Sequence, residues 1–261
     1  MLSFDTSMAT SRGFVKSSAL FSPIPWNTGP MESSKRVANR AASVERIKAT
    51  ARSLVADGGA AALSLREVAR EMDQTSSALY RYFSNRDELL TALIVDAYND
   101  LGIMSERAEA EVDRADLRGR WRAACRAIRQ WAQAHPHEYA LIFGTPIPGY
   151  EAPAFTVAAA TRVTGVIAAI LNDDCLRTPR VTDSRDDELA SVALELSGVA
   201  VVMPDVPASV ALKGVFAWTQ IFGFLSFELF GHLVGSVRRA DEAFEQLTED
   251  VADRLGLSVS M

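Results

Sequence analysis

Three helix signals follow one another closely between residues 43 and 90, and they constrain the fold more than any other feature. The first predicted helix ends at Gly58-Gly59, since glycine accepts the left-handed conformation of a helix C-terminus. Ser64 and Glu67 form a capping box that begins a second helix. A third helix is predicted over residues 75–83. Three short helices, the last two joined by a tight turn, predict a helix-turn-helix.

The remainder of the chain is also predicted to be helical, with no alternating strand of useful length and no internal repeat. Prolines and glycines place a loop over residues 144–153 and polar residues a connector over 172–185. The sequence therefore predicts an all-α protein: an N-terminal three-helix DNA-binding domain with a helix-turn-helix, and a C-terminal helical bundle. Its predicted helices cover residues 87–105, 117–134, 138–143, 154–171, 186–201, 209–231 and 241–255.

These signals divide the chain into three parts: a flexible leader over residues 1–32, a DNA-binding domain over 33–90, and a helical domain for ligand binding and dimerisation over 91–261. The leader contains three prolines and no periodicity, so we expect it to be dispensable. Met8 and Met31 are both candidate translation starts. No secretory signal is recognisable, which favours a cytoplasmic protein.

The longest apolar stretch, Gly214 to Phe227, is shorter than the ~20 residues of a membrane helix, so we expect no membrane association. Two cysteines exclude a disulfide scaffold and a four-ligand zinc site. His135, His137 and Glu138 lie next to Pro136. Histidine and proline are common at helix ends, so this cluster can be explained without a metal. We therefore expect no metal and no cofactor.

Charge is distributed unevenly along the chain. The net charge is −6, yet residues 33–90 carry ten cations and seven anions. A basic N-terminal part on an acidic body suggests that this end approaches phosphate, although a merely solvated surface would give the same count. Three of these cations form a basic arm ahead of the first helix, which either enters a minor groove or stays in solvent: Lys35, Arg36 and Arg40.

The predicted third helix has the properties of a recognition helix. Leu79 and Phe83, four residues apart, would anchor it in the core. Its other face offers small hydroxyl and hydrogen-bonding groups that suit phosphates and base edges. The tyrosines could instead be half-buried core residues, and Arg81 a solvated charge. The candidate DNA-binding residues, including cations before and after this helix, are Arg66, Thr75, Ser76, Ser77, Tyr80, Arg81, Tyr82 and Arg86.

The run from Leu65 to Met72, followed by Thr75 to Leu90, resembles the DNA-binding domain of TetR-type regulators. The specific parts are the Leu-Tyr-x-x-Phe core that begins at Leu79 and the basic residue three positions after Phe83. The resemblance covers residues 43–103. It implies a homodimer with a ligand-binding C-terminal domain, two recognition helices on a near-palindromic double-stranded DNA operator, and release by a small-molecule effector.

The sequence departs from that family in three places. Asp73 stands where the family usually has glycine, and Gln74 where it has a small aliphatic residue. Arg86 replaces the usual lysine and should still reach phosphate. In the tail, Trp218 to Gly223 resembles the Trp-x-x-x-His-Gly stretch of one subgroup, with Phe222 in place of the histidine.

Two sets of apolar residues suggest sites in the C-terminal domain. An apolar or aromatic ligand between the helices would contact Trp121, Trp131, Phe143, Phe155 and Met203, each of which could instead be a core residue. The helix over 209–231 is apolar nearly all round, which predicts burial on both sides, in a dimer or in the centre of a monomeric bundle. With the 241–255 helix it would form a four-helix dimer contact that includes Trp218, Phe222, Phe224, Phe227, Leu247 and Val251.

The sequence thus predicts a sequence-specific, ligand-responsive transcriptional regulator, with repression as the expected mode of action. The predicted helix over 87–105 joins both domains and would transmit the signal. The alternative is a small-molecule enzyme, or a ligand-binding protein with no DNA role. No catalytic constellation that would support an enzyme is recognisable.

Overall fold

The computed structural model describes residues 34–177, 184–193, 203 and 206–257. The predicted leader over residues 1–32 lies outside these ranges. Regular secondary structure in the described residues is helical throughout, which confirms the all-α prediction. The chain divides into two compact units, Met1–Ala42 and Ser43–Met261, and the functional features described below lie mainly in the second.

The N-terminal elements are α1 (Ser34–Gly58), the short 3-10 helix η1 (Ala60–Ala62), α2 (Leu65–Glu71) and α3 (Ser76–Leu79). The Ser64 side chain accepts a hydrogen bond from the Glu67 amide at 3.1 Å, so the predicted cap of α2 is confirmed. α3 is shorter than predicted. The amides of Tyr82 and Phe83 both donate to the Leu79 carbonyl, which closes the chain into a turn immediately after one helical turn.

The turn between α2 and α3 depends on an unusual backbone at Asp73. Its φ is 52°, in the left-handed region, and among the described residues it is the single non-glycine residue with a positive φ. The following amide, of Gln74, donates to the Ala69 carbonyl at 2.8 Å and closes the end of α2. A left-handed non-glycine residue costs about 1 kcal/mol, and Asp tolerates it better than most residues.

α4 (Arg86–Ala110) begins where the Asn85 side chain accepts from the Glu88 amide at 2.8 Å. It is shared by two hydrophobic clusters. Residues from Ile47 to Ile94 form the first, around α1, α2, α3 and the start of α4. The second begins at Ala97 and continues through the C-terminal helices. One continuous helix therefore connects the core of the helix-turn-helix to the core of the C-terminal bundle.

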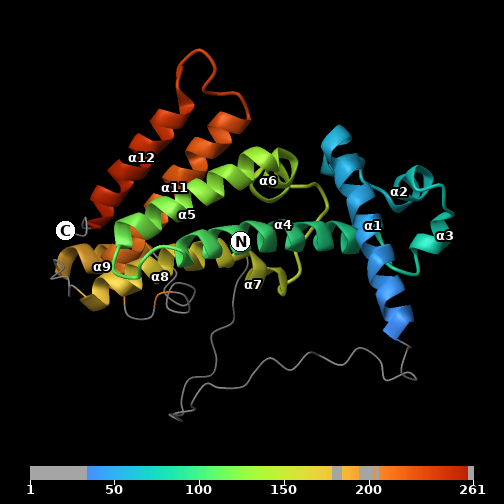
Figure 1. Ribbon diagram of the computed structural model, residues 1–261, viewed down its shortest axis with the longest axis horizontal. Coiled ribbons are helices and arrows are strands. Elements are labelled where there is room, and N and C mark those ends of the chain that lie inside the picture. Colours follow the sequence, from blue (N-terminus) through green and yellow to red (C-terminus); the bar gives the residue numbers. More distant parts are fainter. Residues whose placement is uncertain (1–33, 178–183, 194–202, 204–205, 258–261) are drawn as a thin grey trace, which may run out of the picture. The chain divides into compact units, whose positions relative to one another are not determined.

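Seven described helices form the rest of the chain, and Figure 1 shows α11 and α12 as a neighbouring pair beside α5. The predicted helix over 154–171 is divided at Thr161, and its second part extends into the predicted connector. Pro207, and not Ser209, precedes α11, and Asp187 accepts from the Ser209 amide at 3.0 Å. These helices are α5 (Leu117–Ala134), α6 (Pro136–Phe143), α7 (Thr156–Ala160), α8 (Arg162–Arg177), α9 (Ser184–Ala193), α11 (Ala208–Leu229) and α12 (Ala240–Leu255).

Arginines along α5 tie that helix to its neighbours. Arg118 and Arg122 both pair with Glu249 of α12. Hydrogen bonding from Arg122 lowers the pKa of Glu249 to about 2, against the opposing effect of burial. Arg129 pairs with Glu228 of α11 at 2.6 Å. Such pairs fix the relative positions of α5, α11 and α12, which form one face of the bundle.

α11 is long and apolar enough to cross a membrane by length and composition. The helix packs against α5, α8, α9 and α12, and its Glu228 carboxylate binds Arg129. A central helix of a helical bundle has the same composition, so this observation alone does not indicate a membrane span.

Candidate nucleic-acid interface

The face of α3 that carries the candidate DNA-binding residues lies opposite two side chains that pack in the core. Leu79 is fully buried and Phe83 nearly so, as the sequence predicts. Thr75 and Ser77 are exposed, and their hydroxyls lie 3.0 Å apart. Tyr80, next to the buried Leu79, exposes 51% of its surface. Two hydroxyls and a phenol are therefore presented to solvent by a helix whose other side is fixed in the core.

The other candidate residues near this face differ in their exposure to solvent. Arg66, at the start of α2, and Arg81 are exposed, so both cations are accessible to a phosphate. Ser76 and Tyr82 are half-buried. Tyr82 packs against the first hydrophobic cluster, which favours for this tyrosine the core role that the sequence left open.

Arg86 occupies a different position from the one predicted. Its guanidinium donates to the Leu63 carbonyl at 3.0 Å and to the Ala60 carbonyl at 2.9 Å, and it lies 3.1 Å from Asp87. These carbonyls belong to the connection between α1 and α2. In the structure Arg86 therefore holds that connection against the start of α4, with two of its donor atoms on backbone carbonyls.

The basic arm also differs from the prediction. Lys35, Arg36 and Arg40 lie within α1, which begins at Ser34, and not in a segment ahead of the first helix. All three are exposed. The three cations therefore lie on a helix and not on an extended arm of the kind that reaches into a minor groove.

One ion-pair cluster was missed by the sequence analysis. Asp96 of α4 binds Lys48 at 2.8 Å and also Arg52, both from α1. Burial alone would lower the pKa of Lys48, but hydrogen bonds to Asp96 and Glu45 raise it overall. The four-residue spacing of Lys48 and Arg52, which places both on one face of α1, was the available signal. The cluster holds α1 against the helix that leads to the C-terminal bundle.

The five predicted ligand-pocket residues do not line a common cavity in the described part of the chain. Trp121 and Trp131 are buried in the second hydrophobic cluster, and the Trp121 indole donates to the Thr248 carbonyl at 2.9 Å. Met203 packs against the same cluster. Phe143 and Phe155 border two separate cavities. Most of this set is therefore core, the alternative that the sequence left open.

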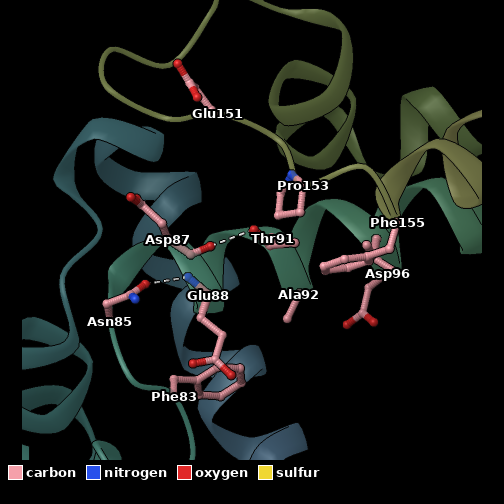
Figure 2. A pocket seen from close by; sticks show the side chains of 11 residues that line it. Phe83, Asn85, Asp87, Glu88, Thr91, Ala92, Asp96, Glu151, Pro153 and Phe155 are labelled. Atoms are coloured by element: carbon pink, nitrogen blue, oxygen red, sulfur yellow. Dashed lines mark hydrogen bonds between the residues drawn. The ribbon is translucent and has the colours of Figure 1, made fainter. Parts of the chain in front are cut away.

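The cavity beside Phe155 follows the first three turns of α4 and has a volume of about 580 Å³ (Figure 2). Two of its carboxylates have partners outside the cavity: Glu88 accepts from the amide and hydroxyl of Ser84, both at 2.6 Å, and Asp96 binds the two cations of α1. Phe155 and Asp96 both line this cavity (Figure 2). Phe155 itself is 68% exposed, so this cavity is open to solvent.

A second cavity, of about 650 Å³, lies where α1 ends. Its walls come from the end of α1 and its connection to η1, from α6 and the loop that follows it, and from the C-terminal end of α11. The lining residues are Val55, Ala56, Gly59, Ala60, His137, Ala140, Leu141, Phe143, Gly144, Thr145, Pro146, Ile147, Ser226 and Phe230. No aspartate, glutamate, lysine or arginine is among them.

The six predicted dimer residues differ in how deeply they are buried. Phe222 and Val251 are buried within the bundle, and Trp218, Phe224 and Leu247 are half-buried against it. Only Phe227 of this set is largely exposed, at 55%. For Phe222 and Val251 the predicted interface role is therefore corrected to a core role.

A different stripe of α11 faces solvent. Phe216 is 53% exposed and Phe230 44%, and at Gly223 an added side-chain carbon would meet no atom within 4 Å. With Phe227, these residues lie at positions i, i+7, i+11 and i+14, which share one helix face. The all-round apolar composition of α11 obscured this stripe, so Phe216 was missed.

These features together define a helix-turn-helix transcriptional regulator, and comparison with known proteins identifies its family. Residues 47–93 match the model of bacterial regulatory proteins of the tetR family, and residues 121–251 match a tetracyclin repressor-like C-terminal domain. The chain is 38% identical over 206 residues to the HTH-type transcriptional regulator Rv1816 of Mycobacterium tuberculosis (strain ATCC 25618 / H37Rv), which covers 75% of this chain and 86% of that protein.

Solved structures agree with this assignment. The structure of SCO4313, a candidate regulatory protein, superposes on this chain with a TM-score of 0.68 at 33% identity. The match covers 84% of this chain and 98% of the SCO4313 chain. The TetR family transcriptional regulator PfmR from Thermus thermophilus shares the fold, with a TM-score of 0.54 at 19% identity over 79% and 96% of the two chains. The chain belongs to the TetR family of DNA-binding transcriptional regulators, which is not a family of enzymes.

Proposed function

We propose that this regulator is a homodimeric, cytoplasmic repressor that binds a near-palindromic operator and acts by binding without catalysis. The observation that carries the DNA-binding role is the geometry of α3. Its buried Leu79 fixes the helix, while Thr75, Ser77 and Tyr80 remain exposed beside the accessible cations Arg66 and Arg81. In this arrangement hydroxyls and cations contact phosphates, and Arg81 is the residue suited to reading guanine.

Variants of the docking face test this role on an operator recovered from genomic DNA. We expect Tyr80→Ala to weaken operator binding while leaving the unfolding transition in place, because the exposed phenol contributes little to the core. Ala49→Ser, at an exposed position of α1, serves as the control. Operator affinity that Tyr80→Ala leaves unchanged would contradict the proposed docking face.

We place the dimer contact on the exposed stripe of α11 that contains Phe216, Gly223 and Phe227. Phe216 and Phe227 are exposed aromatic residues on one face of α11, and the glycine between them permits close approach of a second helix. We expect Phe227→Asp to yield monomers, because a charge buried at the contact lacks a partner. Val234→Asp, at a loop position that is 84% exposed, should leave the dimer intact. Sedimentation of the wild type as a monomer at micromolar concentration would refute the assignment.

We further propose that an apolar or aromatic effector lowers operator affinity by about 5–150-fold, the usual range of coupling between two sites. The continuous α4, which enters both hydrophobic clusters, supports this coupling. Linkage requires that operator DNA weaken effector binding by the same factor. Calorimetric titration of effector into free protein and into the DNA complex therefore tests the proposal. Equal affinities exclude release, and tighter binding in the complex would make the ligand a corepressor.

A further inference from the structure

We propose that the 650 Å³ cavity at the end of α1 is the effector site, and that it takes an uncharged, largely apolar molecule carrying one hydroxyl group. This inference rests on the proposed function for its regulatory meaning, but its binding chemistry follows from the cavity alone. Cavities of about 300–1,000 Å³ with apolar walls and few polar groups are typical small-molecule sites.

The walls offer little to a charged ligand. None of the lining side chains is a carboxylate, an ammonium or a guanidinium, the imidazole of His137 is the one ionisable group among them, and Val55, Leu141, Ile147 and Phe230 supply apolar surface. A charged group buried against the apolar part of these walls would lose its hydration without gaining a partner of opposite charge. The ligand is therefore neutral over most of its surface.

The hydrogen bonds around Ser226 determine which polar group the ligand must carry. The Tyr139 hydroxyl lies 2.9 Å from the Phe222 carbonyl and 2.9 Å from the Ser226 hydroxyl. A carbonyl only accepts, so the single phenolic proton of Tyr139 is donated to it. Ser226 must then donate its own proton to the Tyr139 oxygen. What Ser226 offers to the cavity is consequently a lone pair, which requires a donor on the ligand.

The position of the cavity gives such a ligand a route to the DNA-binding elements. Val55 and Ala56 belong to the last turns of α1, and the neighbouring Ala60 carbonyl is held by Arg86 at the start of α4. Ser226 and Phe230 belong to the end of α11, on which we place the dimer contact. A molecule in this cavity touches the helix-turn-helix and the bundle together, so it favours whichever arrangement of the two it fits better.

Three related probes test the chemistry on DNA-free protein: 2-naphthol, 2-methoxynaphthalene and 2-naphthoate. Calorimetry should show saturable binding of 2-naphthol at one site per chain. The methyl ether lacks the donor and should bind about fivefold more weakly, as the loss of one net hydrogen bond implies. The anionic 2-naphthoate should bind at least about tenfold more weakly. In Ser226→Ala the preference for the naphthol over its ether should disappear.

Variants that fill the cavity locate the site. Ala140→Phe from α6 and Ala56→Leu from α1 both add bulk at the lining, and either folded variant should lower 2-naphthol affinity by about tenfold. Ala134→Phe, at an exposed position of α5 outside the lining, should bind as the wild type does. Absence of saturable binding, or equal affinity in the filled and control variants, would overturn the inference.

The two proposals fail separately. Naphthol binding is measured without DNA, and operator binding is measured without naphthol. A protein that binds the operator but no probe would retain the proposed DNA function and lose this site. One that binds 2-naphthol with the expected pattern but no operator would retain the site and lose its regulatory meaning.

Discussion

Replacing Arg86 with methionine should destabilise the protein without removing a DNA contact. The substitution keeps an apolar stem and deletes the donors to the Leu63 and Ala60 carbonyls. Hydrogen bonds from charged groups contribute about 1.5–3 kcal/mol each, and the 28% exposure of the Arg86 side chain places them at the lower end. The exposed pair with Asp87 adds little. We expect a loss of about 3 kcal/mol in the free energy of unfolding.

Two measurements distinguish this role from a phosphate contact. Urea unfolding followed by circular dichroism, at fixed protomer concentration, gives the stability. The dependence of operator affinity on salt gives the number of phosphate contacts, since each contributes about 0.9 units of slope. Arg86→Met should keep the wild-type slope. Arg66→Met, which removes an exposed cation from the same domain, should lower the slope by about one and leave stability nearly unchanged.

The opposite pattern would refute this assignment. If Arg86→Met unfolds with wild-type stability while its salt slope falls by about one, Arg86 binds phosphate and the observed hydrogen bonds do not contribute measurably to the free energy of unfolding. Arg86→Lys refines the comparison, because it keeps the charge but lacks the planar fork that reaches two carbonyls. We expect its stability to lie between those of the wild type and the methionine variant.

Three further predictions concern stability. Asp73→Gly should raise the free energy of unfolding by about 1 kcal/mol, because glycine adopts the left-handed backbone without strain; a loss of stability in urea would contradict this. Arg120→Met should cost about 3 kcal/mol, because the buried Arg120 side chain binds both Glu109 and Asp173 and its loss leaves the nearly buried Glu109 carboxylate with Arg114 in place of two arginines; Glu109→Gln in the same chain should restore part of the loss. Because Arg122 lowers the pKa of Glu249 from 4.5 to about 2, that carboxylate stabilises the folded state above pH 4.5 and loses this contribution as the pH falls towards 2. Melting temperatures should therefore fall less steeply over this window in Glu249→Gln than in the wild type, and parallel curves would disprove the linkage.

Local signals predicted much of the secondary structure because caps and breakers act over a few residues. The Ser64 cap is present, and α5 has the predicted limits of residues 117 and 134. Asp73 adopts the left-handed backbone that the turn requires. The end of α3 was missed because the return of the chain at Leu79 depends on packing and not on a local breaker.

Sites formed by distant segments could not be predicted in the same way. Trp121 is held by a carbonyl 127 residues away, and the periodicity of its helix carries no signal of that contact. α11 is apolar on all sides, so its sequence could not show that Phe222 faces the core and Phe216 faces solvent. The cavity at the end of α1 is lined mainly by small, aliphatic and aromatic residues from three stretches of the chain, residues 55–60, 137–147 and 226–230, none of which is distinctive alone.

The claim that α3 reads DNA sequence is tested most directly by selecting bound fragments from genomic DNA with the purified wild-type protein. We predict enrichment of one near-palindromic sequence with two half-sites about one helical turn, or a multiple of it, apart, as two recognition helices of a symmetric dimer require. Recovery of fragments with no common sequence, held only at low salt, would show that binding is confined to the phosphate backbone and would contradict the account.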